Sequence, residues 1–283
     1  MQLIDSIDAF RKALDAERAA GGSVGLVPTM GYLHEGHASL MRAAAAENDV
    51  VAATIFVNPL QFGANEDLAG YPRDLQRDQA LATANGVSYL FTPSVEEMYP
   101  LGVPTLTSVH VDGISAPMEG ASRPIHFAGV ATVVAKLFAI AGAGRAYFGE
   151  KDYQQLAVIR RMAADLSFPV EVVGCPTVRE ADGLAMSSRN AYLTAEERAV
   201  APTLHRALVT GAAAIRDGET DADKVRAAMA EIVGGQPRFT LDYAEVADPA
   251  TLEPLSTIHH PDDVRLLIAA RLGRARLIDN LGA

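Results

Sequence analysis

The sequence is poor in cysteine, in aromatic residues and in basic residues, and each shortage excludes a class of protein. Cys175 has no second cysteine to pair with, which excludes a disulfide scaffold and fits a reducing compartment, so we expect a cytoplasmic protein. Tryptophan is absent and aromatic residues make up 6% of the chain, too few to supply the rings on which nucleic-acid bases stack.

The charge balance and the lack of long apolar runs narrow the partners further. Lysine and arginine number 24 against 35 aspartate and glutamate residues, a net charge of −11. Such a chain repels phosphate backbones and anionic lipid, although it can still hold one local basic pocket for a small anion. The longest uncharged stretch, residues 79–95, is interrupted by Gly86 and Pro93, and Asp5 lies where a signal peptide carries base. We therefore expect small-molecule partners, no nucleic acid and no membrane span.

What is present is an ordinary globular composition over 283 residues, with 49% hydrophobic and 21% charged side chains. At roughly 100–200 residues per domain, this length predicts two domains. The pattern changes between Arg189 and Thr194, so we divide the chain into residues 1–189 and residues 190–283.

The first part alternates short apolar runs with helical spacing, which predicts an α/β fold with a doubly wound parallel sheet. The expected strands are residues 24–27, 50–57, 87–91, 146–148 and 170–173. The expected helices include residues 7–14, 36–47, 74–84, 130–138 and 156–166. Residues 99–124, rich in proline and glycine, interrupt the alternation, and we expect an insertion there with a strand-like run at residues 105–111.

The second part groups its helices apart from its strands, which predicts a smaller α+β domain. We expect helices over residues 195–217 and 221–233, followed by strands over residues 240–246, 264–270 and 275–278.

The loop after the first buried strand, PTMGYLHEGH at residues 28–37, is the first candidate site, because ligands of open α/β sheets bind at the carboxyl ends of strands. A P-loop would need Lys and Ser/Thr where His37 and Ala38 stand. A zinc site would need imidazoles at i and i+4, whereas His34 and His37 are three residues apart with Gly36 between them. Two alternatives remain: a histidine pair that faces a nucleotide phosphate at a helix start, and a plain surface loop.

Three further segments place polar side chains at strand ends or in loops. Residues 149–155 follow a strand and carry Lys151, which could bind phosphate, and Asp152, which could bind a ribose hydroxyl, bind a metal or cap a helix. Residues 186–190, MSSRN, offer two hydroxyls and a guanidinium for a triphosphate, or form a polar linker. Asn58 and Gln61, after the second buried strand, are uncharged groups that fit a small hydroxy acid in an apolar pocket.

Taken together, these segments are similar to the pantoate–β-alanine ligase family of the H-x-G-H nucleotidyl transferase superfamily. The matching stretches occur in family order at residues 28–37, 55–62, 71–74, 126–130, 147–155, 176–190 and 271–280. The resemblance implies a Rossmann-like catalytic domain, a smaller carboxyl-terminal domain covering the site, and a homodimer. It also implies ATP-dependent condensation of (R)-pantoate with β-alanine through a pantoyl adenylate, which releases AMP and diphosphate. The implied cofactor is Mg²⁺, and the sequence does not assign its ligands.

The resemblance implies a role for each matching residue. Catalytic roles fall on His37, His34, Lys151 and Arg189. ATP-binding roles fall on Met30, Gly31, His34, Gly36, His37, Gly149, Glu150, Lys151, Asp152, Val178, Met186, Ser187, Ser188 and Arg189. The residues implied to bind pantoate and β-alanine are Met30, Asn58, Gln61 and Gln155. The alternatives are another nucleotidyl transferase with a small phosphorylated or carboxylate acceptor, and a nucleotide-binding module without turnover.

Overall fold

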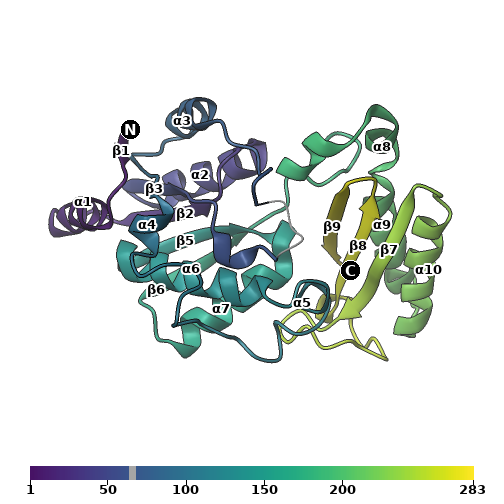
Figure 1. Cartoon of the computed structure of the whole chain (residues 1–283). Helices are drawn as coiled ribbons and strands as arrows, with labels where there is room; N and C mark the ends of the chain where they lie inside the picture. Colours follow the sequence, from purple (N-terminus) through teal and green to yellow (C-terminus); the bar gives the residue numbers. More distant parts are fainter. Residues whose placement is uncertain (64–67) are drawn as a thin grey trace. The chain divides into compact units, whose positions relative to one another are not determined.

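The computed structural model describes residues 1–63 and 68–283 and divides the chain into two compact units (Figure 1). The first unit comprises Met1–Glu150 and Gln154–Pro176, and the second comprises Lys151–Tyr153 and Thr177–Ala283. The first unit thus ends at Pro176, earlier in the sequence than Arg189. The short segment Lys151–Tyr153 of the second unit interrupts the first unit. The functional division between the two parts stays a prediction.

The first unit is built on a six-stranded sheet in the order β1-β4-β3-β2-β5-β6, and every described pairing in it is parallel. The strands are β1 Gln2–Ile4, β2 Val24–Thr29, β3 Val50–Ile55, β4 Tyr89–Phe91, β5 Gly144–Gly149 and β6 Val170–Cys175. Apart from β1, all coincide with apolar runs in the sequence. β2, β3 and β4 are largely buried, as expected of strands covered on both faces, whereas only Cys175 of the edge strand β6 is buried.

Helices connect these strands. The long helices are α1 Ile7–Ala19, α2 Glu35–Glu47, α3 Leu75–Ala84, α6 His126–Ala141 and α7 Tyr153–Asp165, whose first residue belongs to the second unit. The short elements are η1 Pro59–Gln61, α4 Val95–Met98, α5 Glu119–Ser122 and η2 Glu150–Asp152. Side chains cap several starts: the Ser6 hydroxyl accepts the Ala9 N–H at 3.4 Å ahead of α1, and Asp74 accepts the Arg77 N–H at 3.1 Å ahead of α3.

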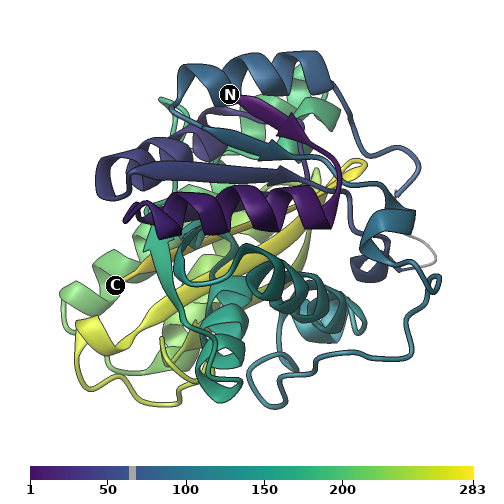
Figure 2. The same ribbon diagram turned by 90° about the vertical axis from the view of Figure 1, so that its left-hand side faces the viewer.

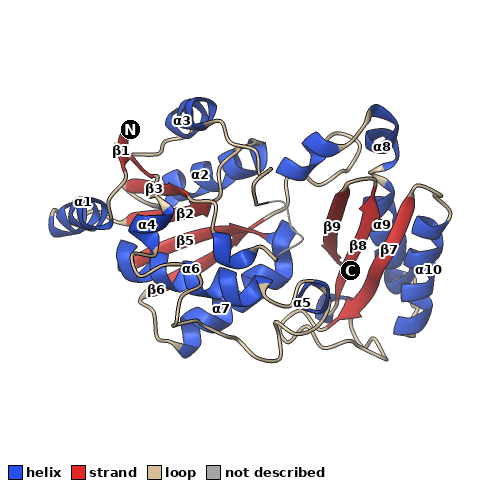
Figure 3. Cartoon of the chain, in the orientation of Figure 1, coloured by secondary structure: helices blue, strands red, loops and turns tan. Residues whose placement is uncertain are grey.

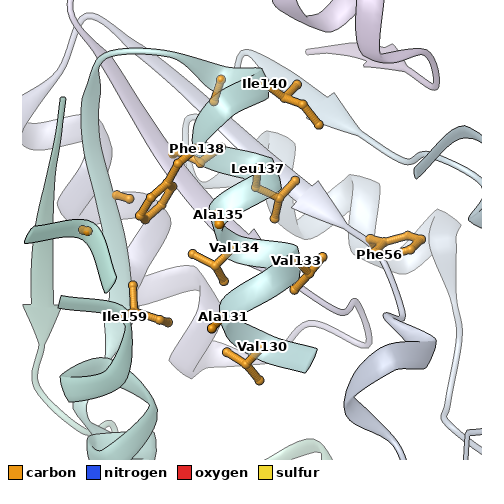
Figure 4. Packing of buried hydrophobic residues seen from close by; sticks show 14 of the residues in the cluster. Phe56, Val130, Ala131, Val133, Val134, Ala135, Leu137, Phe138, Ile140 and Ile159 are labelled. Atoms are coloured by element: carbon orange, nitrogen blue, oxygen red, sulfur yellow. The ribbon is translucent and has the colours of Figure 1, made fainter. Parts of the chain in front are cut away.

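Two hydrophobic cores lie on the two faces of this sheet, as the doubly wound prediction requires. Alternate residues of a strand point to opposite faces. Leu26 of β2 therefore packs in the core that contains α1, α6 and α7 residues, whereas its neighbour Val27 packs in the core that contains α2 residues. In Figure 2 helix α1 lies in front of the strands, and Figure 4 shows the first core along α6, where Phe56 and Ile159 join it from other elements.

The second unit carries an antiparallel three-stranded sheet in the order β7-β8-β9 (Figure 3). Its strands are β7 Phe239–Ala247, β8 Arg265–Leu272 and β9 Ala275–Gly282. Its helical elements are η3 Ser188–Tyr192, α8 Ala195–Val200, α9 Thr203–Arg216, α10 Ala222–Gly234 and η4 Pro261–Asp263. A separate core joins α9 and α10 to this sheet, which confirms the predicted small α+β architecture.

Two local expectations were wrong, and one strand was missed. The helix expected over residues 195–217 is two helices, because Pro202 has no N–H to donate and clashes within a helix. Residues 105–111 form no strand; Thr105 Oγ1 donates to the Thr107 carbonyl at 2.8 Å, a local bond that competes with strand pairing. The edge strand β1 was missed, because only Ile4 of its three residues is buried.

Candidate active site

The order of the strands marks where a ligand of such a sheet binds. From β2 the chain proceeds through β3 to β4 on one side, and it returns to the other side of β2 with β5 and β6. The strand order therefore reverses between β2 and β5, and ligands of open α/β sheets bind at the carboxyl ends of strands at such a point. At this edge lie residues 30–34, which follow β2, and Gly149 at the end of β5 with Glu150 after it; both segments were singled out from the sequence.

The loop after β2 is held by a buried carboxylate on α3. The N–H groups of Tyr32 and Leu33 each donate to Asp78, at 2.7 Å, and Asp78 is 1% exposed. Gly31 has a φ of +85° and Tyr32 a φ of +50°, so the backbone turns sharply here. Burial raises the pKa of Asp78 above its ordinary value, and the two backbone N–H donors oppose that rise. The loop conformation is thus fixed from outside its own sequence.

His34 and His37 cap the start of α2 reciprocally. The Gly36 N–H donates to Nδ1 of His34 at 3.1 Å, and the His34 N–H donates to Nδ1 of His37 at 3.3 Å. The ring centroids are 4.1 Å apart. A ring nitrogen that accepts a hydrogen bond carries no hydrogen, so each neutral ring bears its proton on Nε2. Both imidazoles are therefore donors at Nε2, at the positive end of a helix dipole.

Gly36 gives the His34 ring its place. A Cβ on Gly36 would lie 2.8 Å from Cε1 and 2.9 Å from Nδ1 of His34, closer than side-chain atoms approach. The glycine in the H-x-G-H pattern therefore makes room for the first imidazole of the pair.

A second set of predicted residues is joined by hydrogen bonds after β3. Asn58 is 1% exposed and Gln61 6%. The Asn58 amide donates to Gln61 Oε1 at 3.1 Å, and the Gln61 amide donates to the Met30 Sδ at 3.1 Å. Tyr99, whose pKa is raised by burial, donates its hydroxyl to Asn58 Oδ1 at 2.8 Å. A Cβ on Gly129 of α6 would lie 2.3 Å from the Leu60 carbonyl oxygen, so this glycine lets α6 pack against η1.

The second unit holds the other predicted nucleotide-binding residues. The Met186 N–H donates to the Val178 carbonyl at 3.0 Å, so a tight hairpin brings these two residues side by side. The hairpin leads into η3, where the Ser187 hydroxyl accepts the Arg189 N–H at 3.2 Å. Residues 186–189 are half-buried, and the second half of the predicted polar segment is part of η3.

The last residue of β5 and the residues that follow it are divided between the two units. Gly149 and Glu150 belong to the first unit, whereas Lys151 and Asp152 belong to the second. The Lys151 ammonium lies 3.6 Å from a carboxylate oxygen of Asp152, and the Lys151 side chain is 16% exposed. A Cβ on Gly149 would meet no described atom within 4 Å, so a ligand can approach the backbone there.

Gln155 is half-buried on α7, and its neighbour Gln154 is the buried one. The amide of Gln154 donates to the carbonyls of Ile114 and Pro117, at 3.0 and 2.8 Å, and thereby holds the insertion. The sequence reasoning chose Gln155 for substrate, a role that stays a prediction.

Within the first unit the structure thus brings Met30, Asn58 and Gln61 together, and separately His34 and His37. Within the second unit it brings Val178 beside Met186. The sequence reasoning missed Asp78 and Tyr99. Asp78 carried a usable signal: it stands four residues before Ala82 on the buried stripe of α3, where an apolar residue is expected.

A parallel doubly wound sheet with a histidine-bearing helix start at its switch point places the chain in the class of nucleotide-binding α/β proteins. The comparisons with known proteins narrow this class. The family model described as pantoate–β-alanine ligase matches residues 2–282. The pantothenate synthetase of Moorella thermoacetica is 55% identical over 281 residues, which cover 99% of this chain and 98% of that protein. That of Rhizobium meliloti is 54% identical over 280 residues, which cover 99% and 95%.

Solved structures agree. The crystal structure of pantothenate synthetase from Thermus thermophilus superposes with a TM-score of 0.93 at 51% identity, covering 100% of this chain and 99% of that one. Pantoate–β-alanine ligase from Francisella tularensis, complexed with β,γ-ATP and β-alanine, gives a TM-score of 0.79 at 34% identity, covering 99% and 97%. The chain therefore belongs to the pantoate–β-alanine ligase family. This membership does not favour the alternative of a different nucleotidyl transferase.

Proposed function

We propose that this chain condenses pantoate with β-alanine, splits ATP to AMP and diphosphate, and passes through a pantoyl adenylate. Membership of the ligase family over residues 2–282 carries the proposal. The paired imidazoles at the start of α2 would supply Nε2–H donors to the phosphates as negative charge develops on them.

In the first step a carboxylate oxygen of pantoate attacks the α-phosphorus of ATP. The carboxylate is ionised at neutral pH and needs no base. A new bond forms between that oxygen and the α-phosphorus. The bond between the α-phosphorus and the oxygen that bridges the α- and β-phosphates breaks, and diphosphate leaves with its electron pair. Negative charge builds on the phosphates, so catalysis here consists of positioning and donor groups. His34 and His37 would supply Nε2–H donors, and the first turn of α2 would supply backbone N–H groups.

Other residues would make the remaining nucleotide contacts. The family resemblance gives Gly31, Gly36, Gly149 and Glu150 the role of accommodating ATP. It gives Lys151 and Arg189 the role of stabilising phosphate charge, and further ATP contacts to Asp152, Val178, Met186, Ser187 and Ser188.

Mg²⁺, when bound, would neutralise negative charge on the phosphates. Among residues 1–63 and 68–283, no cluster of three or more acidic, histidine or cysteine side chains gathers into a metal cage. A chain with that donor set suits an ion that arrives bound to the triphosphate, because Mg²⁺ is commonly held by substrate phosphates and one or two carboxylates. Asp152, a carboxylate in the proposed phosphate-binding segment, is a residue that would hold the ion.

Pantoate would bind at Met30, Asn58, Gln61 and Gln155, with Gln61 also reaching β-alanine. The hydrogen-bonded run from Tyr99 through Asn58 to Gln61 supports this assignment, because it fixes the amides that a hydroxy acid would meet. In the second step the neutral amine of β-alanine attacks the acyl carbon, the bond to AMP breaks, and the AMP phosphate or a solvent molecule takes the amine proton.

We also propose that the protein works in the cytoplasm as a homodimer, on small molecules alone. Among the described helices, none combines the length and the apolar character that crossing a membrane requires.

The test is exchange of labelled diphosphate into ATP with and without pantoate, followed by AMP release with and without β-alanine. We expect exchange only with pantoate, and stoichiometric AMP and pantothenate once β-alanine is added. Exchange that needs a phosphorylated acceptor instead of pantoate would support the second candidate, another nucleotidyl transferase. ATP binding without any exchange would indicate a module without turnover.

A further inference from the structure

The segment Lys151–Tyr153 is held by carboxyl-terminal residues of the second unit. The carbonyl of Lys151 accepts the Asn280 side-chain N–H at 2.8 Å. The guanidinium of Arg265 lies 4.0 Å from the centroid of the Tyr153 ring, and the Tyr153 hydroxyl donates to the Pro249 carbonyl at 3.0 Å. These contacts explain why three residues that follow β5 directly belong to the second unit.

Asp279, the residue before Asn280, holds residues 178–189, the other segment of that unit that is proposed to bind the nucleotide. Asp279, 5% exposed, accepts two bonds from the Arg179 guanidinium, at 2.7 and 2.9 Å. Arg179 also donates to the Gly183 carbonyl at 3.0 Å, inside the hairpin that places Val178 beside Met186. A paired and bidentate contact of this kind fixes both position and orientation.

The orientation of the Asn280 amide follows from its neighbours. Arg265 has only donors, and its Nε points to Oδ1 of Asn280 at 2.8 Å. The Lys151 carbonyl only accepts, so the amide nitrogen must face it. The Asn280 backbone N–H donates to Asp279 Oδ1 at 2.7 Å, and the residue is 3% exposed. A buried amide that accepts from Arg265 and donates to the Lys151 carbonyl has one orientation, and it thereby fixes the position of that carbonyl.

We propose that Asn280 and Asp279 are positioning residues for ATP. Together they fix residues 151–152 and residues 178–189 relative to each other. β9 is an edge strand, and successive side chains of a strand leave opposite faces, so two adjacent residues can fasten two separate segments. Neither residue has to touch the nucleotide. This inference rests on the proposed function, because it gives a purpose to the ATP-binding segments named there.

Asn280→Asp removes the hydrogen bond of the side chain to the Lys151 carbonyl and keeps its contact with Arg265. The new carboxylate keeps an oxygen for Arg265 but turns a second oxygen toward the Lys151 carbonyl, where no hydrogen lies between them. We expect the KM for ATP in pantoate-dependent exchange to rise about tenfold, as for the loss of one buried hydrogen bond. The KM for pantoate should change less than about twofold, because this substitution leaves Asn58 and Gln61 untouched.

The matched control is Asp242→Asn. Asp242 of β7 pairs with Arg276 of β9 at 2.8 and 2.7 Å, so the substitution weakens an ionic contact to the same strand. We expect its KM for ATP to equal that of the parent chain. The second variant is Tyr153→Phe, which removes the bond to Pro249 while Asn280 stays intact, and its KM for ATP should rise about threefold.

The inference is overturned if folded Asn280→Asp keeps the parent KM for ATP, or if the constants for ATP and pantoate rise together and also rise in Asp242→Asn. If Asn280→Asp does not fold, an unchanged KM for ATP in Tyr153→Phe overturns it instead, and a raised one supports it. A parent chain without pantoate-dependent exchange would overturn the proposed function alone. Calorimetric binding of ATP to the same variants would then decide the positioning role.

Discussion

The carboxylate of Asp78 accepts the backbone N–H of Leu33 at 2.7 Å, although the two residues are 45 positions apart in the chain. The same carboxylate accepts the N–H of Tyr32, so one side chain on α3 fixes the turn that precedes the histidine pair. The placement of His34 and His37 therefore depends on a residue that lies outside their motif.

Replacing Asp78 by Asn should slow adenylate formation about tenfold. An amide offers one oxygen to two backbone donors, so one buried N–H loses its partner at a cost of about 1–3 kcal/mol and the loop shifts. Single-turnover formation of the adenylate measures the effect. Asp74→Asn on the same helix is the control, because Asn caps a helix as well as Asp does, and its rate should not change. Equal rates for the parent and Asp78→Asn would contradict the positioning role.

The pH dependence of the free energy of unfolding should differ between the parent chain and Asp78→Asn. Burial raises the pKa of Asp78 above its ordinary 3.8, so the folded chain holds that proton more tightly than the unfolded chain does. The contribution of Asp78 to the free energy of unfolding is thus fully present below pH 3.8 and is lost as pH rises through the raised pKa.

Urea unfolding of the parent chain and of Asp78→Asn across this range measures the difference. The stability of the parent relative to the variant should fall as pH rises. A difference that stays constant, or grows with pH, would show that the two backbone N–H donors outweigh burial.

His37→Ala should slow adenylate formation by about 10²–10³, the range for loss of one transition-state donor, and leave pantoate binding largely intact. It should also cost about 1 kcal/mol of stability, because Nδ1 of His37 caps the His34 N–H. Single-turnover kinetics and calorimetry separate the two effects. His110→Ala, at an exposed histidine, should change neither quantity. Normal chemistry in His37→Ala would refute the catalytic role.

Gly36→Ala should slow adenylate formation about tenfold or more, because the added Cβ would push the His34 ring from its place. The control is Gly234→Ala at the end of α10, where a Cβ would meet nothing within 4 Å. That change should leave the kinetics unaltered and add about 0.4–1 kcal/mol of stability by restricting the unfolded chain. The idea fails if both alanine variants react at the parent rate.

Tyr99→Phe should raise the KM for pantoate about fivefold and leave the KM for ATP unchanged. The substitution removes the hydroxyl that donates to Asn58 Oδ1 and thereby loosens the amide that contacts Gln61. Tyr89→Phe is the control, since its hydroxyl pairs with Glu17 instead. Steady-state kinetics with each substrate varied in turn measures the outcome, and a rise for both substrates in both variants would indicate a general loss of structure.

Much of the fold follows from local pattern. The β-branched run at residues 50–57 predicted a strand buried on both faces, and β3 packs Ala52 into one core and Ala53 into the other. The run at residues 105–111 is also rich in β-branched residues, yet it forms no strand. Strand formation needs a partner strand to satisfy the backbone, and composition does not say whether one is near.

The sequence by itself determined the class of fold, the family and the motif residues, because periodicity, glycine placement and a collinear set of motifs are local properties of the chain. The shortage of basic residues argued against nucleic-acid partners but did not show where Lys151, Arg189 and the two histidines would be used. Only the tertiary structure showed that Asp78 accepts the N–H groups of the turn before the histidines, and that Asn280 donates to the Lys151 carbonyl. These contacts join residues 45 and 129 positions apart, a separation that only folding can close.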